Sequence, residues 1–140
     1  MEIIKVDESN LEMISKFLNS LEIINDINKD VVLNGSYVFE DEVVGFLSFE
    51  EFNKIGLIRY FVFKKMVDHK IVMDLFNKVC LSAKKKNIDT LITLVVKEEA
   101  ISVFRELGFT VADKKDVYIE EININDTRFK DAIVLKYSLK

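Results

Sequence analysis

The chain has 140 residues, and 20 Lys and Arg against 24 Asp and Glu give a formal net charge of −4. Hydrophobic residues make up 49% and charged residues 31%, a composition typical of globular rather than disordered proteins. The acidic balance argues against a nucleic-acid-binding surface, which requires a basic field. One cysteine excludes an intrachain disulfide, and one histidine argues against a histidine-based metal site or catalytic triad.

No segment of the sequence has the composition of a linker. Proline is absent and there are four glycines. Met1–Val6 has no basic region and no long apolar stretch, which argues against a signal peptide. The apolar runs are far shorter than the roughly 20 residues that a membrane helix needs. We therefore expect a single domain over residues 1–140 that lies in the cytoplasm and does not contact a membrane.

The N-terminal residues predict a strand followed by two helices. Glu2–Val6 has the pattern of a short strand. Apolar residues at helical spacing run from Leu11 to Leu21, and Ser9 and Glu12 have the spacing of a capping box. A second, weaker helical pattern runs from Ile24 to Val32.

The apolar period then changes to that of a three-stranded antiparallel meander. Asn34-Gly35 is a turn signal. The segments that follow are rich in aromatic and β-branched residues and are separated by short polar breaks: Tyr37–Glu40, Val43–Glu50 and Gly56–Phe63. In the third segment both parities are apolar, as expected of a central strand that is covered on both faces.

The next part of the chain predicts the longest helix and another strand. A continuous apolar stripe from Ile71 to Ala83 indicates the helix, with Asp68 as its N-cap. Lys84-Lys85-Lys86 ends this helix, where cations suit the negative end of the helix dipole. Thr90–Val96 is an apolar, β-branched strand.

The C-terminal part predicts a short helix and two strands. The helix is Glu98–Leu107, with Gly108 at its C′ position. The first strand lies within Val111–Ile124, and a slip of apolar parity at Glu120-Glu121 indicates a bulge. The second strand lies within Ala132–Leu139.

The order of elements defines the fold class. The succession is β-α-α-β-β-β-α-β-α-β-β, and its central strand, helix and strand imply one parallel pair within a mixed sheet. We therefore expect an α+β fold with α/β/α layers. Its sheet is mixed, mostly antiparallel and twisted, with about seven strands and about four helices.

Two segments give this order a family resemblance. Phe104-Arg105-Glu106-Leu107-Gly108-Phe109 ends the short helix, and Val43-Val44-Gly45-Phe46 lies in the predicted hairpin. With the element order, they resemble the GCN5-related N-acetyltransferase (GNAT) superfamily over nearly the whole chain. The resemblance implies direct transfer of an acetyl group from acetyl-CoA to a primary amine, on a small molecule or a peptide.

The loop that binds the acyl-CoA pyrophosphate in this family departs from its pattern here. The family pattern is R/Q-x-x-G-x-G/A at the start of a helix, where free N–H groups favour an anion and glycines admit the phosphates. The matching residues contain no glycine: Val67-Asp68-His69-Lys70-Ile71-Val72. We expect the Asp68 carboxylate to compete with phosphate for these N–H groups. Four cationic side chains could offset its charge: Lys64, Lys65, His69 and Lys70.

Two other positions of the family's cofactor site are also altered. Lys97 stands where an Asn often helps to hold the cofactor, and Phe104 stands where a Tyr is often the general acid toward the leaving thiolate. The resemblance implies that backbone groups of the fourth strand hold the pantetheine arm, and these groups require no particular side chain. The residues concerned are Tyr60, Phe61, Val62 and Phe63.

The transfer also needs a base for the amine and an acid for the leaving thiolate. The candidate bases are Glu50 and Glu51, at the end of the third strand, and the candidate acids are Tyr60 and Tyr118. No metal ligands are predicted. Cys80 lies on the apolar helical stripe and is interpreted as a small core residue.

Three kinds of function therefore remain open. The first is an N-acetyltransferase with acetyl-CoA as its cosubstrate. The second is a catalytically inactive binding or interaction module that has lost acyl-CoA binding, which the altered cofactor positions favour. The third is a binder of another small molecule, suggested by the aromatic strands. A homodimer through the C-terminal strands is also possible, because edge residues such as Ile122 and Ile124 are apolar.

Overall fold

The computed structural model describes residues 1–21, 27–95, 98–113, 118–119, 122–123 and 132–140. The helices are α1 (Leu11–Ser20), α2 (Lys29–Leu33), α3 (His69–Lys85) and α4 (Glu98–Leu107). The strands are β1 (Glu2–Lys5), β2 (Ser36–Glu40), β3 (Glu42–Phe52), β4 (Ile55–Phe63), β5 (Thr90–Val95), β6 (Thr110–Val111), β7 (Tyr118–Ile119), β8 (Ile122–Asn123) and β9 (Ile133–Ser138).

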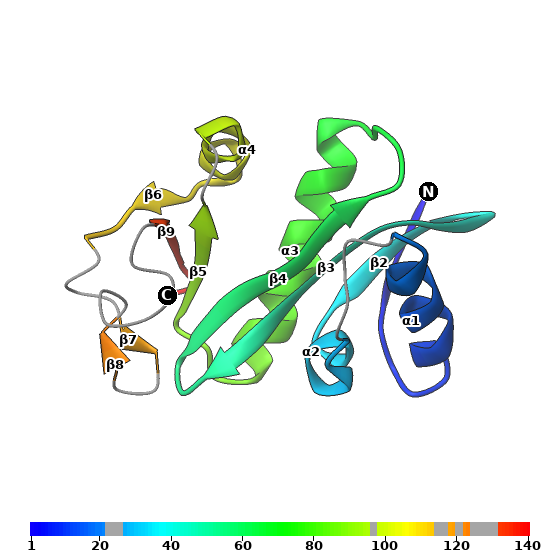
Figure 1. Cartoon of the computed structure of the whole chain (residues 1–140), viewed down its shortest axis with the longest axis horizontal. Helices are drawn as coiled ribbons and strands as arrows, with labels where there is room; N and C mark the ends of the chain where they lie inside the picture. The colour runs from blue at the N-terminus through cyan, green and yellow to red at the C-terminus, as the bar shows by residue number, and fades with distance from the viewer. Residues whose placement is uncertain (22–26, 96–97, 114–117, 120–121, 124–131) are drawn as a thin grey trace.

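Seven of these strands form one mixed sheet, in the order β1-β2-β3-β4-β5-β9-β6 (Figure 1). Its pairs are antiparallel except for β4 and β5, which are parallel because α3 connects them as a crossover. Strands β7 and β8 form a separate two-stranded sheet. The fold class predicted from the sequence, including its single parallel pair, is confirmed.

The helices cover both faces of the sheet. On one face, buried residues of α3 and α4 pack with the sheet in one cluster that includes Leu75, Phe76, Phe104 and Leu107. On the other face, Ile14, Phe17 and Leu18 of α1 and Val32 of α2 form a second cluster with Tyr37, Val43 and Phe46. Figure 1 shows α3 passing behind β3 and β4. The sheet therefore needs apolar residues of both parities in its central strands.

The helix starts differ from the prediction in their capping. The capping box at Ser9 and Glu12 is wrong, because the N-cap of α1 is Asn10 and its side chain makes no capping hydrogen bond. The N–H and the hydroxyl of Ser9 both donate to the carboxylate of Asp7 instead. These bonds lower the pKa of Asp7 from its usual value. A short polar side chain has thus bonded locally rather than to the helix.

The second helix is shorter than its apolar pattern suggests. It begins at Lys29, and the side chain of Asn28 accepts hydrogen bonds from the N–H groups of Asp30 and Val31. The beginning of the predicted pattern, at Ile24, lies outside the described residues. An Asx cap therefore fixes where α2 starts.

Two helices end on residues with positive φ. Gly108 follows α4 with φ 108°, as its predicted C′ position requires. Asn87 follows α3 with φ 64°, and the sequence reading did not identify it. Asn tolerates this conformation because its short polar side chain can bond locally.

The strands also differ in length and in their irregularities. Strands β3 and β4 extend the predicted hairpin to a turn at Asn53, where φ is 58°. The bulge predicted at Glu120-Glu121 lies outside the described residues. The register instead shifts between Val38 and Phe39, and again between Phe46 and Ser48.

We expect Gly108→Ala to lower the free energy of unfolding by about 1–3 kcal/mol, since a side chain would be strained at positive φ. The added Cβ would also lie 2.9 Å from a ring carbon of Tyr137. Urea denaturation monitored by circular dichroism measures this change. Val103→Ala is the control, because Val103 is 45% exposed on α4. Equal destabilisation by both variants would contradict the role assigned to Gly108.

We expect Cys80 to be unreactive in the native protein. It is a buried part of the core, as predicted, and burial raises the pKa of its thiol to about 11. Because the thiolate is the nucleophile, labelling by a disulfide reagent at pH 8 should be roughly 100-fold slower than in guanidinium chloride. Rapid labelling of the native protein, measured by absorbance, would contradict this expectation.

Candidate functional site

The parallel strands β4 and β5 pair only at their beginnings. The register joins Ile55–Leu57 to Thr90–Ile92, and no later pair follows in the described residues, although β4 continues to Phe63 and β5 to Val95. The two strands diverge beyond this point (Figure 1). A pocket of about 400 Å³, called here the splay pocket, lies at the divergence and is lined by Ile58, Tyr60, Phe61, Thr93, Leu94, Val95, Ala100 and Phe104.

A bulge in β4 coincides with the start of the divergence. Ser48 of β3 is opposite Arg59, whereas Phe46 is opposite Val62, so Leu47 faces two residues of β4, Tyr60 and Phe61. Tyr60 has φ 55°, a conformation that costs a bulky residue about 1–3 kcal/mol. The extra residue interrupts the β-ladder and redirects the strand.

The contacts of Tyr60 hold this strained backbone in place. Its hydroxyl oxygen accepts a hydrogen bond of 3.2 Å from the N–H of Asn28, immediately before α2. Its ring stacks with Phe46, with 6.3 Å between the centroids. The guanidinium carbon of Arg59 lies 5.4 Å from the centroid of the Tyr60 ring. The bulge is therefore anchored to the face of the sheet that α1 and α2 cover.

The two candidate bases occupy different surroundings. Glu50 is opposite Leu57, the last residue of β4 that pairs with β5. Its carboxylate accepts a hydrogen bond of 2.6 Å from Arg59 Nη1. Glu51 belongs to the other parity of β3, and its carboxylate pairs with Lys86 Nζ at 2.8 Å. Of the two, Glu50 lies beside the start of the divergence.

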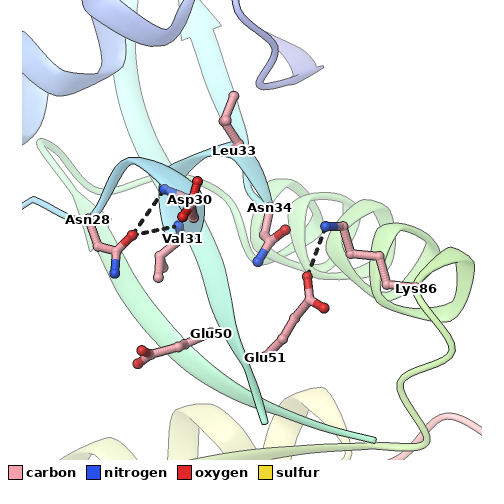
Figure 2. A pocket seen from close by; sticks show the side chains of 8 residues that line it. All are labelled: Asn28, Asp30, Val31, Leu33, Asn34, Glu50, Glu51 and Lys86. Atoms are coloured by element: carbon pink, nitrogen blue, oxygen red, sulfur yellow. Dashed lines mark hydrogen bonds and ion pairs between the residues drawn. The ribbon is translucent and has the colours of Figure 1, made fainter. Parts of the chain in front are cut away.

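A second pocket, of about 500 Å³, lies between α2 and the end of β3 (Figure 2). We call it the edge pocket. Glu50 and Asn28 line it, and they contact Arg59 and Tyr60 respectively. Tyr60 also lines the splay pocket, so its hydrogen bond to Asn28 links a residue of one pocket to a residue of the other. The other lining residues are Asp30, Val31, Leu33, Asn34, Glu51 and Lys86.

At the start of α3, predicted to be the pyrophosphate loop, the acidic side chain does not occupy the backbone N–H groups. Asp68 is the N-cap, but its side chain makes no capping hydrogen bond, so the expected competition for N–H groups is wrong. The N–H groups of Ile71 and Val72 donate to the Asp68 carbonyl, at 2.9 and 3.3 Å. Those of His69 and Lys70 donate to no group in the part of the chain described.

Three of the four cationic side chains near this loop already have acidic partners. Lys64 pairs with Glu42 at 2.8 Å and Lys65 with Glu40 at 3.8 Å. His69 Nδ1 lies 3.6 Å from Glu106 Oε2 of α4. Lys70 forms no ion pair with any described residue. It is therefore the cation near this loop with the most freedom to meet a phosphate.

Two contacts connect the elements on either side of the divergence, on the face of the sheet that α3 and α4 cover. One side, or arm, consists of β4 and α3, and the other arm consists of β5 and α4. The centroids of the Phe61 ring in β4 and the Phe104 ring in α4 lie 5.5 Å apart. A second contact joins His69, at the start of α3, to Glu106 of α4. Phe104 is 8% exposed and also packs against Phe109. Phe104 is therefore a core residue. A tyrosine at this position would need a hydrogen-bond partner for its hydroxyl, and phenylalanine does not.

Two candidate side chains lie outside the described part of the structure, and two residues of the site were not predicted from the sequence. Lys97 and the side chain of Tyr118 are not described. Arg59 and Asn28 were not singled out from the sequence, although Arg59 is the only charged residue in the segment Ile55–Phe63. A lone charge in an otherwise apolar strand was the available signal for it.

No group of three or more His, Cys, Asp or Glu side chains among the described residues could hold a metal ion. No described helix combines the length and the apolar character needed to cross a bilayer.

Comparisons with known proteins find similarity in structure only. No protein-family model matches the sequence, and no curated protein matches it. Rv2747 from Mycobacterium tuberculosis, solved in complex with CoA, is 16% identical over 100% of both chains with a TM-score of 0.71. An acetyltransferase of the GNAT family from Staphylococcus aureus Mu50 is 18% identical over 99% of both chains, with a TM-score of 0.67.

A third similar structure is N-acetylglutamate synthase from Neisseria gonorrhoeae, in complex with coenzyme A and L-arginine. It is 17% identical, with a TM-score of 0.70, over 98% of the present chain. The present chain spans about a third of that protein, 32% of its length. The chain therefore has the fold of the GNAT superfamily, the family that its sequence resembles.

Proposed function

We propose that this protein is an N-acetyltransferase that moves an acetyl group directly from acetyl-CoA to a primary amine. The observation that carries the proposal is the divergence of β4 and β5 at the Tyr60 bulge. It opens a pocket lined by Tyr60 and by Ile58, the residue that follows the partner of Glu50 in the strand register. The presence of CoA in two of the similar structures supports acetyl-CoA as the cosubstrate.

The residues present fit the two ends of acetyl-CoA to different degrees. The backbone of Tyr60–Phe63 and the splay pocket would hold the pantetheine arm, because this part of β4 has left its pairing with β5. The N–H groups of His69 and Lys70, with the Lys70 side chain, would hold the pyrophosphate at the start of α3. When bound, acetyl-CoA supplies an acetyl group activated as a thioester.

The residues around Tyr60 can move the protons that the transfer requires. Glu50 takes a proton from the protonated form of the acceptor amine, and the neutral nitrogen then forms a bond to the acetyl carbonyl carbon. The carbon–sulfur bond breaks, Tyr60 gives its phenolic proton to the departing thiolate, and the nitrogen passes its second proton to the Tyr60 oxygen. The N–H of Asn28, which donates to the Tyr60 oxygen, would stabilise the resulting phenolate.

Other parts of the proposal rest on composition. We place the protein in the cytoplasm, with a small-molecule or peptide amine as substrate and no nucleic-acid or membrane partner. A net charge of −4 and one buried, unpaired cysteine are consistent with this placement. We also propose a homodimer through the C-terminal strands.

One alternative function has specific support. The Phe61–Phe104 and His69–Glu106 contacts join the two arms of the divergence, and the loop at the start of α3 contains no glycine. Both features favour a binding or interaction module with the same fold that does not bind acyl-CoA. Affinity for acetyl-CoA distinguishes the two functions.

We expect calorimetric titration with acetyl-CoA to give a dissociation constant in the micromolar range, about −8 kcal/mol. Lys70→Glu should weaken binding about tenfold or more, since hydrogen bonds to charged groups contribute about 1.5–3 kcal/mol. Lys84→Glu, at the other end of α3, is the matched control and should bind normally.

No heat of binding and no thermal stabilisation by millimolar acetyl-CoA would contradict the enzyme. In that case, glycines at three positions test whether the loop is responsible: Asp68→Gly, Lys70→Gly and Val72→Gly in one chain. Binding restored by these changes would assign the loss to the loop, and continued absence of binding would assign it to the splay pocket.

We expect Glu50→Gln to lower kcat by roughly 10²–10⁴-fold, the range typical of general bases. Glu51→Gln is the matched comparison, because Glu51 is the neighbouring carboxylate but pairs with Lys86. The assay follows CoA release with an acceptor amine, and acetyl-CoA affinity should be unchanged in both variants. A larger loss in Glu51→Gln would assign the base to that residue instead.

A further inference from the structure

Arg59 connects the two side chains that the proposed reaction uses. Its Nη1 lies 2.6 Å from Glu50 Oε1, and its guanidinium carbon lies 5.4 Å from the centroid of the Tyr60 ring. It follows Ile58, the first residue of β4 beyond the pairing with β5. The guanidinium therefore contacts one lining residue of each pocket, Glu50 of the edge pocket and Tyr60 of the splay pocket.

The Arg59–Glu50 contact leaves much of the guanidinium available to another group. In the part of the chain described, only one of the five N–H groups of Arg59 donates, and it donates to a single carboxylate oxygen. The Arg59 side chain is 37% exposed and that of Glu50 is 28% exposed. A guanidinium binds a carboxylate most strongly through two parallel hydrogen bonds, so Arg59 can still bind a carboxylate in that geometry.

We propose that the acceptor is an α-amino acid and that Arg59 binds its carboxylate. This inference rests on the proposed function and specifies its substrate class. An α-amino acid carries its amine and its carboxylate on the same carbon. Its carboxylate could therefore bind Arg59 while its amine meets Glu50, since these two side chains are in direct contact. The substrate carboxylate replaces Glu50 on Arg59, and the substrate ammonium then lies beside Glu50.

The exchange explains how Glu50 becomes available as a base. Released from Arg59, it takes one proton from the ammonium, and the neutral nitrogen attacks the acetyl carbonyl carbon. The carbon–sulfur bond breaks, Tyr60 gives its proton to the thiolate, and the second proton of the nitrogen passes to the Tyr60 phenolate. A simple amine would not produce this exchange, because its cation would enter next to the guanidinium with no anion to compensate. Like charges in contact are strongly disfavoured, so Arg59 selects against such amines.

The test is a panel of acceptors assayed with the intact protein and acetyl-CoA, following release of the CoA thiol. The panel is the twenty L-amino acids, with the primary amide and the decarboxylated amine of each amino acid that reacts. These derivatives keep the amine and the side chain but lose the carboxylate. We expect kcat/KM for the amino acid to exceed that of both derivatives by about tenfold or more.

Arg59→Lys tests the residue itself, since lysine keeps the charge but lacks the paired N–H groups. We expect KM for the amino acid to rise about tenfold, while kcat/KM for its amide changes less than about threefold. The affinity for acetyl-CoA should be unchanged. Arg105→Lys, at an exposed position on α4 outside both pockets, is the matched control.

Two outcomes would overturn the inference while leaving the proposed function in place. In the first, acetyl-CoA binds but decarboxylated amines react as well as the amino acids, or no amino acid accelerates thiol release. In the second, Arg59→Lys lowers kcat on the amino acid and its amide equally, which would mean that Arg59 only positions Glu50. Absence of acetyl-CoA binding, measured by the separate titration, would instead overturn the proposed function.

Discussion

The candidate site of this protein depends on the backbone conformation of one residue, Tyr60. Its φ of 55° inserts an extra residue into β4 opposite Leu47, and the parallel pairing with β5 ends at Leu57. Without that early end, two adjacent strands would satisfy each other's backbone groups along their length, and the splay pocket could not form between them. The strain is held by the Asn28 hydrogen bond and by ring packing, so α2 and the neighbouring strand together stabilise the opening.

Ion pairing decides which charged side chains near the site can meet a ligand. Lys64, Lys65 and Glu51 are paired with residues away from the splay pocket. Arg59 and Lys70 retain donors; Arg59 lies within β4 and Lys70 at the start of α3. Under the proposed function, Arg59 would receive the acceptor and Lys70 the pyrophosphate of acetyl-CoA. The glutamates that pair with Lys64 and Lys65 are more than 20 residues away in the sequence, so only the folded structure shows these pairs.

Much of the fold could be predicted because it depends on apolar periodicity. The stripe from Ile71 to Ala83 and the two-faced apolar strand Gly56–Phe63 identified the crossover and hence the parallel pair. Local competition between polar side chains was harder to predict. Ser9 bonded to Asp7 instead of capping α1, and Asp68 occupies an N-cap position without a side-chain bond. Short polar side chains can bond to a neighbouring loop residue as well as to a helix start, so residue type alone does not select between the two.

The sequence by itself determined the order of elements, the family resemblance and the absence of glycine from the pyrophosphate loop, because these are properties of residue type and spacing. It also supplied Glu50 and Tyr60 as candidates. Only the tertiary structure decided that Glu50, rather than Glu51, lies beside the divergence and that Arg59 contacts both Glu50 and Tyr60. The reason is that strand register and a bulge with positive φ set which side chains meet, and in this chain no glycine marks the bulge in the sequence.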